Sequence, residues 1–406
     1  LPGGHMRTLF QAGFFSVAGL ALGLLAGPSW ADAPAAGTHM QHTRPQLGSS
    51  AVFDAKGQLL VAAKEGDHVV LYRSADQGQT WAEPLKVNAQ AEAIAADGQS
   101  RPKIALATDG SVLISWTQPL PKPYTGAVRM ARAADGEHFA TPFTVHGDKA
   151  EITHRFESML ALPGNKVVVA WIDKREAEAA KARKAPYRGA GIYAALSTDG
   201  GQTFGREYKL ADHSCECCRL AASVDRDGAP LFLWRHVFEP NERDHALVKL
   251  GADGQVRSFQ RATFDGWKLD GCPHHGPGLT VDKQGVKHAV WFNQKDGQPN
   301  VFYGRLVDAG KALRVEGQRA VGSPRAAHAD VLAAGNKLAV IWTEFNGEAT
   351  RLLGMVSSDG GRNFDAPVEL DASAGAVSTP SLVAKGDALF AFWRTEREGM
   401  RVRPLP

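Results

Sequence analysis

The sequence predicts an all-β protein, a β-propeller built from four-stranded antiparallel blades. A turn pattern, Ser-x-Asp-x-Gly-x-[Thr/Asn]-[Trp/Phe], occurs three times, at 74–81, 197–204 and 357–364. Its aspartate can accept hydrogen bonds from the backbone of its own turn, and its glycine suits a positive φ angle. Its aromatic ring can anchor the turn in a hydrophobic layer. Recurrence of one such unit along a chain indicates a repeat architecture.

Hydrophobic strands that end in tryptophan are the second repeating feature. They are nearly continuous apolar runs, which is typical of strands covered on both faces. A short strand and a glycine-containing turn precede them, as at 104–110. One unit therefore holds four strands in roughly 50 to 60 residues, the size of a propeller blade. The tryptophans, which we expect to pack between blades, are Trp116, Trp171, Trp234, Trp291, Trp342 and Trp393.

The number of repeats favours seven blades. Six full units run from about 44 to 370, and three further strands are expected within 381–405. Residues 37–43 are the natural source of a fourth strand that would complete the seventh blade and close the ring. Six blades remain possible if the last strands complete or cap another blade. The charged insertion at 174–184 is expected to form a short helix.

The first 31 residues are predicted to be a secretory signal peptide with five residues upstream of its start at Met6. Arg7 is followed by an apolar run at 9–25 and by a small-x-Ala pattern at 29–31. The alternative is an uncleaved membrane anchor. Residues 32–406 are then a single propeller domain, expected to be monomeric and periplasmic or extracellular.

Composition limits the classes of partner. The net charge is +3 and no long basic run is present, which argues against a nucleic-acid partner. No hydrophobic run after the N-terminal segment is long enough to span a membrane, so no membrane partner is expected once that segment is removed. The expected partner is an anionic small molecule, an acidic glycan or a protein.

The repeated turn, in this blade context, resembles the Asp-box, or bacterial neuraminidase repeat, of the sialidase superfamily. The resemblance covers essentially the whole chain after residue 31 and implies a sialidase-like propeller whose Asp-boxes lie away from the active site. The cysteine pattern Cys-Glu-Cys-Cys at 215–218, followed by Gly-Cys-Pro at 271–273, also resembles a group of secreted bacterial sialidase-like proteins.

Whether the protein is an enzyme stays open at this point. The resemblance implies, as one alternative, an exo-acting sialidase-type glycoside hydrolase with arginines on the substrate carboxylate, a tyrosine nucleophile assisted by a glutamate, and an aspartate acid/base. Arg44 and Arg325 match arginine positions loosely, and Asp54 or Asp173 could be the acid. No tyrosine stands where the first strand of a late blade begins, so the catalytic residues are unknown.

An arginine-rich face is the leading functional hypothesis. Five arginines occupy the same position, just before or at the start of a blade's first strand. Guanidinium groups bind carboxylate, phosphate or sulfate, and several of them around one axis attract anions. Arg235 and Arg394 could add to this face. The rival interpretation is that the arginines pair with acidic residues and join blades. The five arginines are Arg44, Arg101, Arg155, Arg219 and Arg325.

The four cysteines form a second candidate site. In an oxidising compartment their even number predicts two disulfides. The alternative is a copper or zinc site, because thiolate and imidazole ligands suit these metals. Three more histidines, His154, His213 and His328, lie near the starts of blades. The candidate metal ligands are Cys215, Cys217, Cys218, Cys272, His274 and His275.

Overall fold

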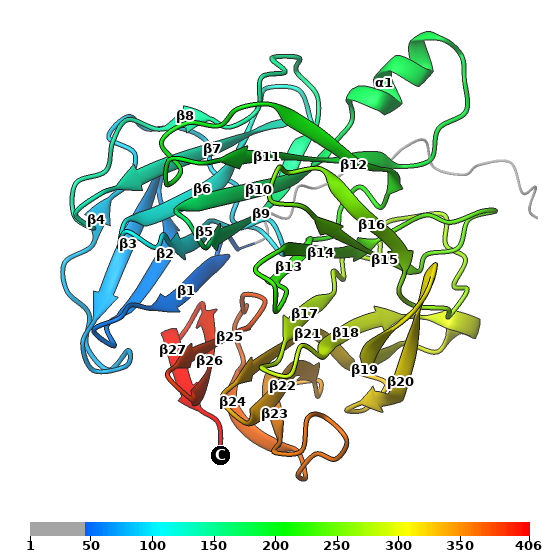
Figure 1. Cartoon of the computed structure of the whole chain (residues 1–406). Coiled ribbons are helices and arrows are strands. Elements are labelled where there is room, and N and C mark those ends of the chain that lie inside the picture. Colours follow the sequence, from blue (N-terminus) through cyan, green and yellow to red (C-terminus); the bar gives the residue numbers. More distant parts are fainter. Residues whose placement is uncertain (1–44) are drawn as a thin grey trace, which may run out of the picture. The chain divides into compact units, whose positions relative to one another are not determined.

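A computed structural model describes residues 45–406, which form seven antiparallel β-sheets, six with four strands and one with three. The first strand of each sheet contacts the first strand of the next, and that of the last sheet contacts the first. The described residues therefore close into a ring of seven blades, coloured in sequence order in Figure 1. This confirms the predicted all-β propeller and decides for seven blades over six.

In every blade the strands follow sequence order from the innermost to the outermost. The innermost strands are β1 (Ser49–Phe53), β5 (Lys103–Leu106), β9 (His154–Leu162), β13 (Ala221–Val224), β17 (Gly278–Val281), β21 (Ala326–Ala334) and β25 (Ser381–Lys385). The second strands are β2 (Leu59–Glu65), β6 (Val112–Pro119), β10 (Lys166–Asp173), β14 (Pro230–Arg235), β18 (Lys287–Asn293), β22 (Lys337–Phe345) and β26 (Ala388–Thr395).

The third strands are β3 (His68–Ser74), β7 (Gly126–Ala133), β11 (Ala190–Ser197), β15 (His245–Leu250), β19 (Asn300–Ala309), β23 (Thr350–Ser357) and β27 (Gly399–Pro404). The fourth strands of the first six blades are β4 (Leu85–Lys86), β8 (Phe143–Thr144), β12 (Glu207–Ser214), β16 (Val256–Arg261), β20 (Ala312–Val321) and β24 (Val368–Ser373).

The six tryptophans of the second strands are fully buried, as the sequence predicts. Five of their indole N–H groups donate a hydrogen bond to a carboxylate, as Trp116 does to Glu92 and Trp171 to Asp173. Trp234 is the exception, because its indole nitrogen has no partner among the described residues. Buried polar groups are usually paired, so the fourth blade differs locally from its neighbours.

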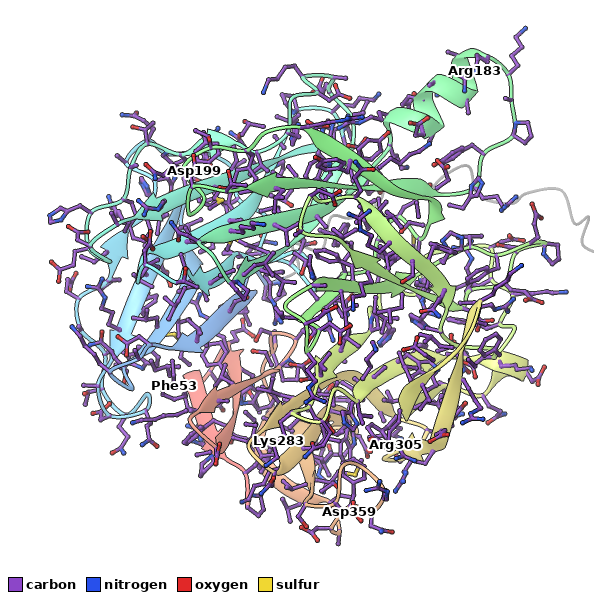
Figure 2. The ribbon with its side chains drawn as sticks, viewed as in Figure 1. Phe53, Arg183, Asp199, Lys283, Arg305 and Asp359 are labelled. Atoms are coloured by element: carbon purple, nitrogen blue, oxygen red, sulfur yellow. The ribbon has the colours of Figure 1, made fainter. Side chains whose placement is uncertain are left out.

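The three repeated turns use their aspartates as expected. Asp359 accepts hydrogen bonds from the backbone N–H groups of Arg362 (3.0 Å) and Asn363 (2.9 Å). Asp199 plays the same part in its own turn, in a different blade (Figure 2). Gly361 has a φ of 76°, and a side chain there would collide with the hydroxyl of Tyr303, so only glycine fits.

The seventh blade packs against the first. Phe53 lies at this junction (Figure 2) and shares a hydrophobic cluster with Phe390 and Phe392. Arg394 forms an ion pair with Glu65 at 2.6 Å across the same junction. The predicted fourth strand of this blade, 37–43, lies outside the described residues.

The insertion after β10 forms the short helix α1 (Arg175–Ala182), as predicted, and a 3₁₀ turn, η1 (Lys295–Gly297), follows β18. Within residues 45–406, no helix combines the length and the apolar character needed to cross a membrane.

Candidate functional site

The strand order gives the ring two different faces. Because neighbouring strands are antiparallel, the segments that precede the first strands share one face with the segments that follow the second strands. We call this the axial face; it carries Arg101, Arg155, Arg219 and Arg325. The Asp-turns connect third to fourth strands and therefore lie on the opposite face.

Two of the predicted arginines come together near the axis. The backbone N–H of Arg219 bonds Gln99 Oε1 at 3.1 Å, and Arg101 lies close enough to Arg219 for their charges to repel. Their guanidinium groups also bind backbone carbonyls of distant blades, Arg101 that of Thr379 (2.7 Å) and Arg219 that of Ala329 (2.7 Å). These two arginines thus link blades across the axis.

The other predicted arginines are placed differently. Arg155 lies over the ring of Phe156, 5.1 Å from its centroid, and near enough to Glu157 to influence its charge. Arg325 is exposed. Arg44 lies outside the described residues.

Sequence reasoning missed several charged groups beside Arg101 and Arg219. Lys103 donates to the carbonyl of Arg101 at 3.1 Å, and the carboxylate of Asp330 accepts from the backbone N–H of Leu382. Both are single charged residues within first strands, and their neighbours across the axis become visible only when the ring closes. We call the following group the axial cluster. Its members are Gln99, Arg101, Lys103, Glu157, Arg219 and Asp330.

Burial shapes the electrostatics of the axial cluster. It lowers the pKa of Arg101 to about 10, helped by the charge of Arg219, and also lowers the pKa of Lys103. Burial raises the pKa of Glu157, a shift that the charge of Lys103 opposes. The cations are thus held in a poorly solvated place, where Arg219 disfavours the charged forms of Arg101 and Lys103 while Asp330 and Glu157 favour them.

Several hydrogen-bonding atoms of the axial cluster have no partner in residues 45–406. They include three donors, Gln99 Nε2, Arg101 Nε and Arg219 Nη1, and the acceptor Glu157 Oε1. No ion pair joins the charged side chains of the cluster to one another in this part of the chain. Buried donors of this kind normally require a partner, so the cluster is suited to hold an acceptor-rich group.

The predicted pairing of arginines with acidic residues holds at one place. Arg394 pairs with Glu65 and joins the seventh blade to the first. Asp173 pairs instead with Arg175 of helix α1 at 2.7 Å, and Glu344 binds the hydroxyl of Ser323 at 2.9 Å. Neither contact involves one of the five predicted arginines.

The cysteines gather in one group without forming disulfides. Cys215 Sγ lies 3.3 Å from Cys218 Sγ and 3.8 Å from Cys217 Sγ. An S–S bond is about 2.05 Å long, and all four cysteines are free, so the predicted disulfides are not present in the structure. Cys272 lies close enough to Cys215 and Cys217 to influence their pKa values, so it stands beside the compact group formed by the other three cysteines.

Contacts among the thiols lower the pKa of one cysteine and raise that of another. Hydrogen bonds from Cys217, Cys218 and Cys272 lower the pKa of Cys215 well below its usual value. Hydrogen bonding with Cys215 raises the pKa of Cys218. The cluster therefore favours one thiolate, at Cys215, stabilised by its neighbours.

Within residues 45–406, the compact group of sulfurs contains no histidine. His275 stacks between Phe292 and His328, with ring centroids 4.1 and 4.5 Å away. His154 lies 3.7 Å from Asp148 and 3.8 Å from Asp173. Arg175 already pairs with both of these aspartates, so its positive charge compensates the carboxylates of this second group.

Strained backbone gathers on the axial face. Non-glycine residues with positive φ angles stand near the starts of four blades, and such conformations are most frequent at functional sites. The residues are Phe156, His213, His274 and His328.

Tyr303 does not supply a nucleophile at the axial cluster. Tyr303, the single tyrosine of the last three blades, is fully buried, and its hydroxyl bonds His288 Nδ1 at 2.8 Å. Asp173, a candidate acid, is also fully buried against Arg175. Both side chains are thus enclosed by the protein.

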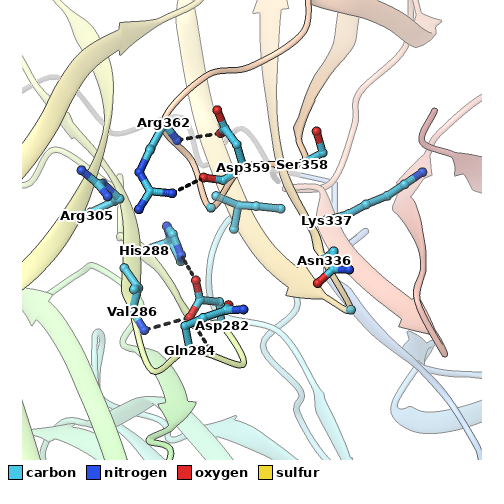
Figure 3. Close-up of a pocket in the computed structure, with 13 residues that line it drawn as sticks. Asp282, Gln284, Val286, His288, Arg305, Asn336, Lys337, Ser358, Asp359 and Arg362 are labelled. Carbon is cyan, nitrogen blue, oxygen red and sulfur yellow. Dashed lines mark hydrogen bonds and ion pairs between the residues drawn. The ribbon is translucent and has the colours of Figure 1, made fainter.

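A pocket of about 240 Å³ opens on the face of the Asp-turns (Figure 3). It lies between the turn that contains Asp282 and the turn that contains Asp359. Its polar lining is largely paired, since His288 Nε2 lies 3.1 Å from Asp282 and Arg362 binds the carbonyl of Asp359 at 2.8 Å. These contacts stabilise the two turns, and we assign the pocket no ligand.

The sequence matches no family model and no curated protein. Solved structures share its fold. The polysaccharide lyase Uly1 aligns with a TM-score of 0.57 and 9% identity, over 88% of each chain. An ulvan lyase of polysaccharide lyase family PL25, bound to -[GlcA(1-4)Rha3S]-, aligns with a TM-score of 0.56 and 11% identity, over 87% of this chain and 90% of that one.

A protein of unknown function from Dyadobacter fermentans aligns with a TM-score of 0.52 and 13% identity, over 75% of this chain and 93% of that one. At such identities the likeness shows the fold alone. The propeller implied by the sialidase resemblance is thus confirmed, and the family assignment stays a prediction.

Proposed function

We propose that this protein binds an acidic saccharide at the axial cluster. The observation that carries the proposal is the convergence of Arg101, Lys103 and Arg219, from two blades, with donors that have no partner and form no ion pair within residues 45–406. A carboxylate or sulfate would accept hydrogen bonds from these donors and offset the mutual repulsion of the cations.

Access to the cluster supports the proposal. Part of the surface of Arg101 and of Lys103 is exposed, so an acidic group can contact these two residues. A uronic acid or a sulfated sugar presents such a group on a compact ring. The ulvan lyase of the same fold, bound to -[GlcA(1-4)Rha3S]-, shows that a propeller of this kind can hold a saccharide carrying both groups.

The proposal is limited to binding, because Tyr303 points into the core rather than to the axis. If residues 1–31 act as the predicted signal peptide, the protein would meet such saccharides outside the cytoplasm.

Calorimetric titration with ulvan oligosaccharides, compared with neutral maltooligosaccharides of equal length, tests the proposal. Binding of the acidic series should weaken as salt rises. Lys103→Met and Arg101→Gln should each weaken it about tenfold or more, because a charged hydrogen bond contributes about 1.5–3 kcal/mol. Since burial lowers the pKa of Lys103 to about 7, wild-type affinity should fall as pH rises through that value.

Arg257→Gln is the matched control, because Arg257 is exposed on the face of the Asp-turns and pairs with Asp253. Its affinity should equal that of the wild type. Binding that is independent of salt, or equally strong in Lys103→Met and Arg101→Gln, would exclude the axial cluster as the site.

A further inference from the structure

We propose that Cys215, Cys217, Cys218 and Cys272 together bind a soft, thiophilic cation, zinc or copper(I). Three of the thiols lie together in the segment that enters the fourth blade, and Cys272, in the segment that enters the fifth, lies near them. This site adjoins the axial cluster, because Cys218 directly precedes Arg219, but it does not depend on the proposed saccharide.

The distances between the sulfur atoms fit a tetrahedral metal site. The three sulfurs of residues 215–218 lie within 4.8 Å of one another. Around a tetrahedral zinc with Zn–S bonds of about 2.3 Å, neighbouring sulfurs stand about 3.8 Å apart. The separations of 3.8 and 3.3 Å from Cys215 are close to this value, and both are far from the length of a disulfide.

The surroundings of the sulfur atoms hold them in fixed positions, as expected for a binding site. Cys215, Cys217 and Cys218 are buried in the hydrophobic cluster that contains Trp234. The backbone N–H of Cys215 donates to the carbonyl of Arg235 at 2.9 Å, which fixes the loop on the second strand. Cys272 is exposed and provides a route by which a metal ion can enter.

A buried positive charge stands beside the thiols. Arg235 is fully buried, and its guanidinium donates only to backbone carbonyls, among them those of His275 and Phe292. No carboxylate pairs with it in residues 45–406. Its charge acts on Cys215 and Cys218. It can therefore offset the net negative charge that several thiolates give to a metal–thiolate complex.

The donor atoms select the class of metal. In the described part of the chain, the compact group consists of sulfur alone, with no carboxylate or imidazole in it. Sulfur-only sites favour zinc, copper(I) or iron–sulfur clusters over magnesium, calcium or manganese. Three clustered thiolates with Cys272 nearby suit one d¹⁰ ion, and zinc and copper(I) are the two that biology supplies.

Metal analysis of the full chain, purified without chelators, tests the inference. Protein loaded with Zn²⁺ or with Cu⁺ should retain one ion per chain after desalting. Loading with Co²⁺ should give the visible bands of a tetrahedral site and a thiolate charge-transfer band. Competition between Zn²⁺ and Cu⁺ decides which of the two is held more tightly.

Cys272→Ser is the informative variant, since an exposed residue can change without unfolding the protein. It should weaken metal binding by roughly tenfold or more, because even outer-shell changes cost that much. Circular dichroism and the melting temperature report whether it folds. Glu216→Gln, in the same loop but with its carboxylate paired to Lys174, should leave the stoichiometry at one.

Two results would overturn the inference. One is native protein without metal, without reactive thiols, and lighter than the reduced chain by four hydrogen atoms, which means two disulfides. The other is a protein with four reactive thiols that retains neither Zn²⁺ nor Cu⁺ after loading.

Discussion

Single aspartates stabilise the Asp-turns by accepting several hydrogen bonds at once. Oδ1 of Asp359 accepts from two backbone N–H groups and from the hydroxyl of Ser357, and Oδ2 accepts from Asn363 Nδ2 at 2.7 Å. The backbone bond from Asn363, with the others, lowers the pKa of Asp359. All these bonds favour the ionised form of the side chain.

Asp359→Asn should therefore lower the melting temperature by a few degrees at neutral pH, because its amide would face the amide of Asn363. A lowered pKa adds stability that is present above the ordinary aspartate value and is lost as pH falls through the folded-state value. The variant should accordingly lose less stability than the wild type as pH falls below about 4. Thermal melts across this range measure both effects.

Asp365→Asn is the matched control in the same turn, since Asp365 is exposed. It makes the same change of charge and should follow the wild type. Equal melting temperatures for the Asp359 and Asp365 variants would contradict the role assigned to the turn.

At the residue scale, sequence reasoning predicted the turns well and the axial site only in part. A turn is local, so the spacing of Asp359, Gly361 and Phe364 is enough to specify it. The hydrogen bond from the Arg219 backbone to Gln99 joins the fourth blade to the second. No local pattern reveals it, and Lys103 has no distinguishing neighbours in the sequence.

The second strands are the elements that the sequence specifies most clearly. Each is an apolar run whose tryptophan is buried between blades, and in five blades its indole N–H binds a carboxylate. Trp234 lacks such a partner and shares its hydrophobic cluster with three cysteines. The fourth blade thus has the scaffold of its neighbours but a different environment at this strand.

Trp171→Phe should lower the free energy of unfolding by about 1–2 kcal/mol more than Trp234→Phe. Both changes leave a similar cavity, but only the first removes a hydrogen bond, the one at 2.8 Å from the indole to Asp173. Denaturant unfolding of the two variants measures the difference. Equal losses of stability would show that the bond to Asp173 contributes nothing.

At the scale of the whole molecule, ring closure places the functional groups. The seventh blade contacts the first through Phe53, Phe390 and Phe392 and through the ion pair between Arg394 and Glu65. Only when β25 meets β1 does the carbonyl of Thr379 come within 2.7 Å of Arg101. The axial cluster therefore depends on the closed ring.

Removal of residues 37–43 should destabilise this closure if they supply the predicted fourth strand of the last blade. The truncated protein should melt several degrees lower and be cleaved sooner by protease at the seventh blade, because β27 would present an unpaired edge. Removal of 32–36 alone is the control and should change neither property. An unchanged melting temperature in the longer truncation would refute the strand.

The sequence alone determined the blades: the apolar runs, the Asp-turns and the helix after β10 all follow from residues close together in the chain. Only the tertiary structure decided the sites. It brought Arg101 and Arg219 together, buried Arg235 and paired Arg394 with Glu65. It also gathered Cys272 with three cysteines more than fifty residues earlier. The physical reason is that blade formation depends on local periodicity, whereas the direction of each side chain at the axis depends on how seven blades close.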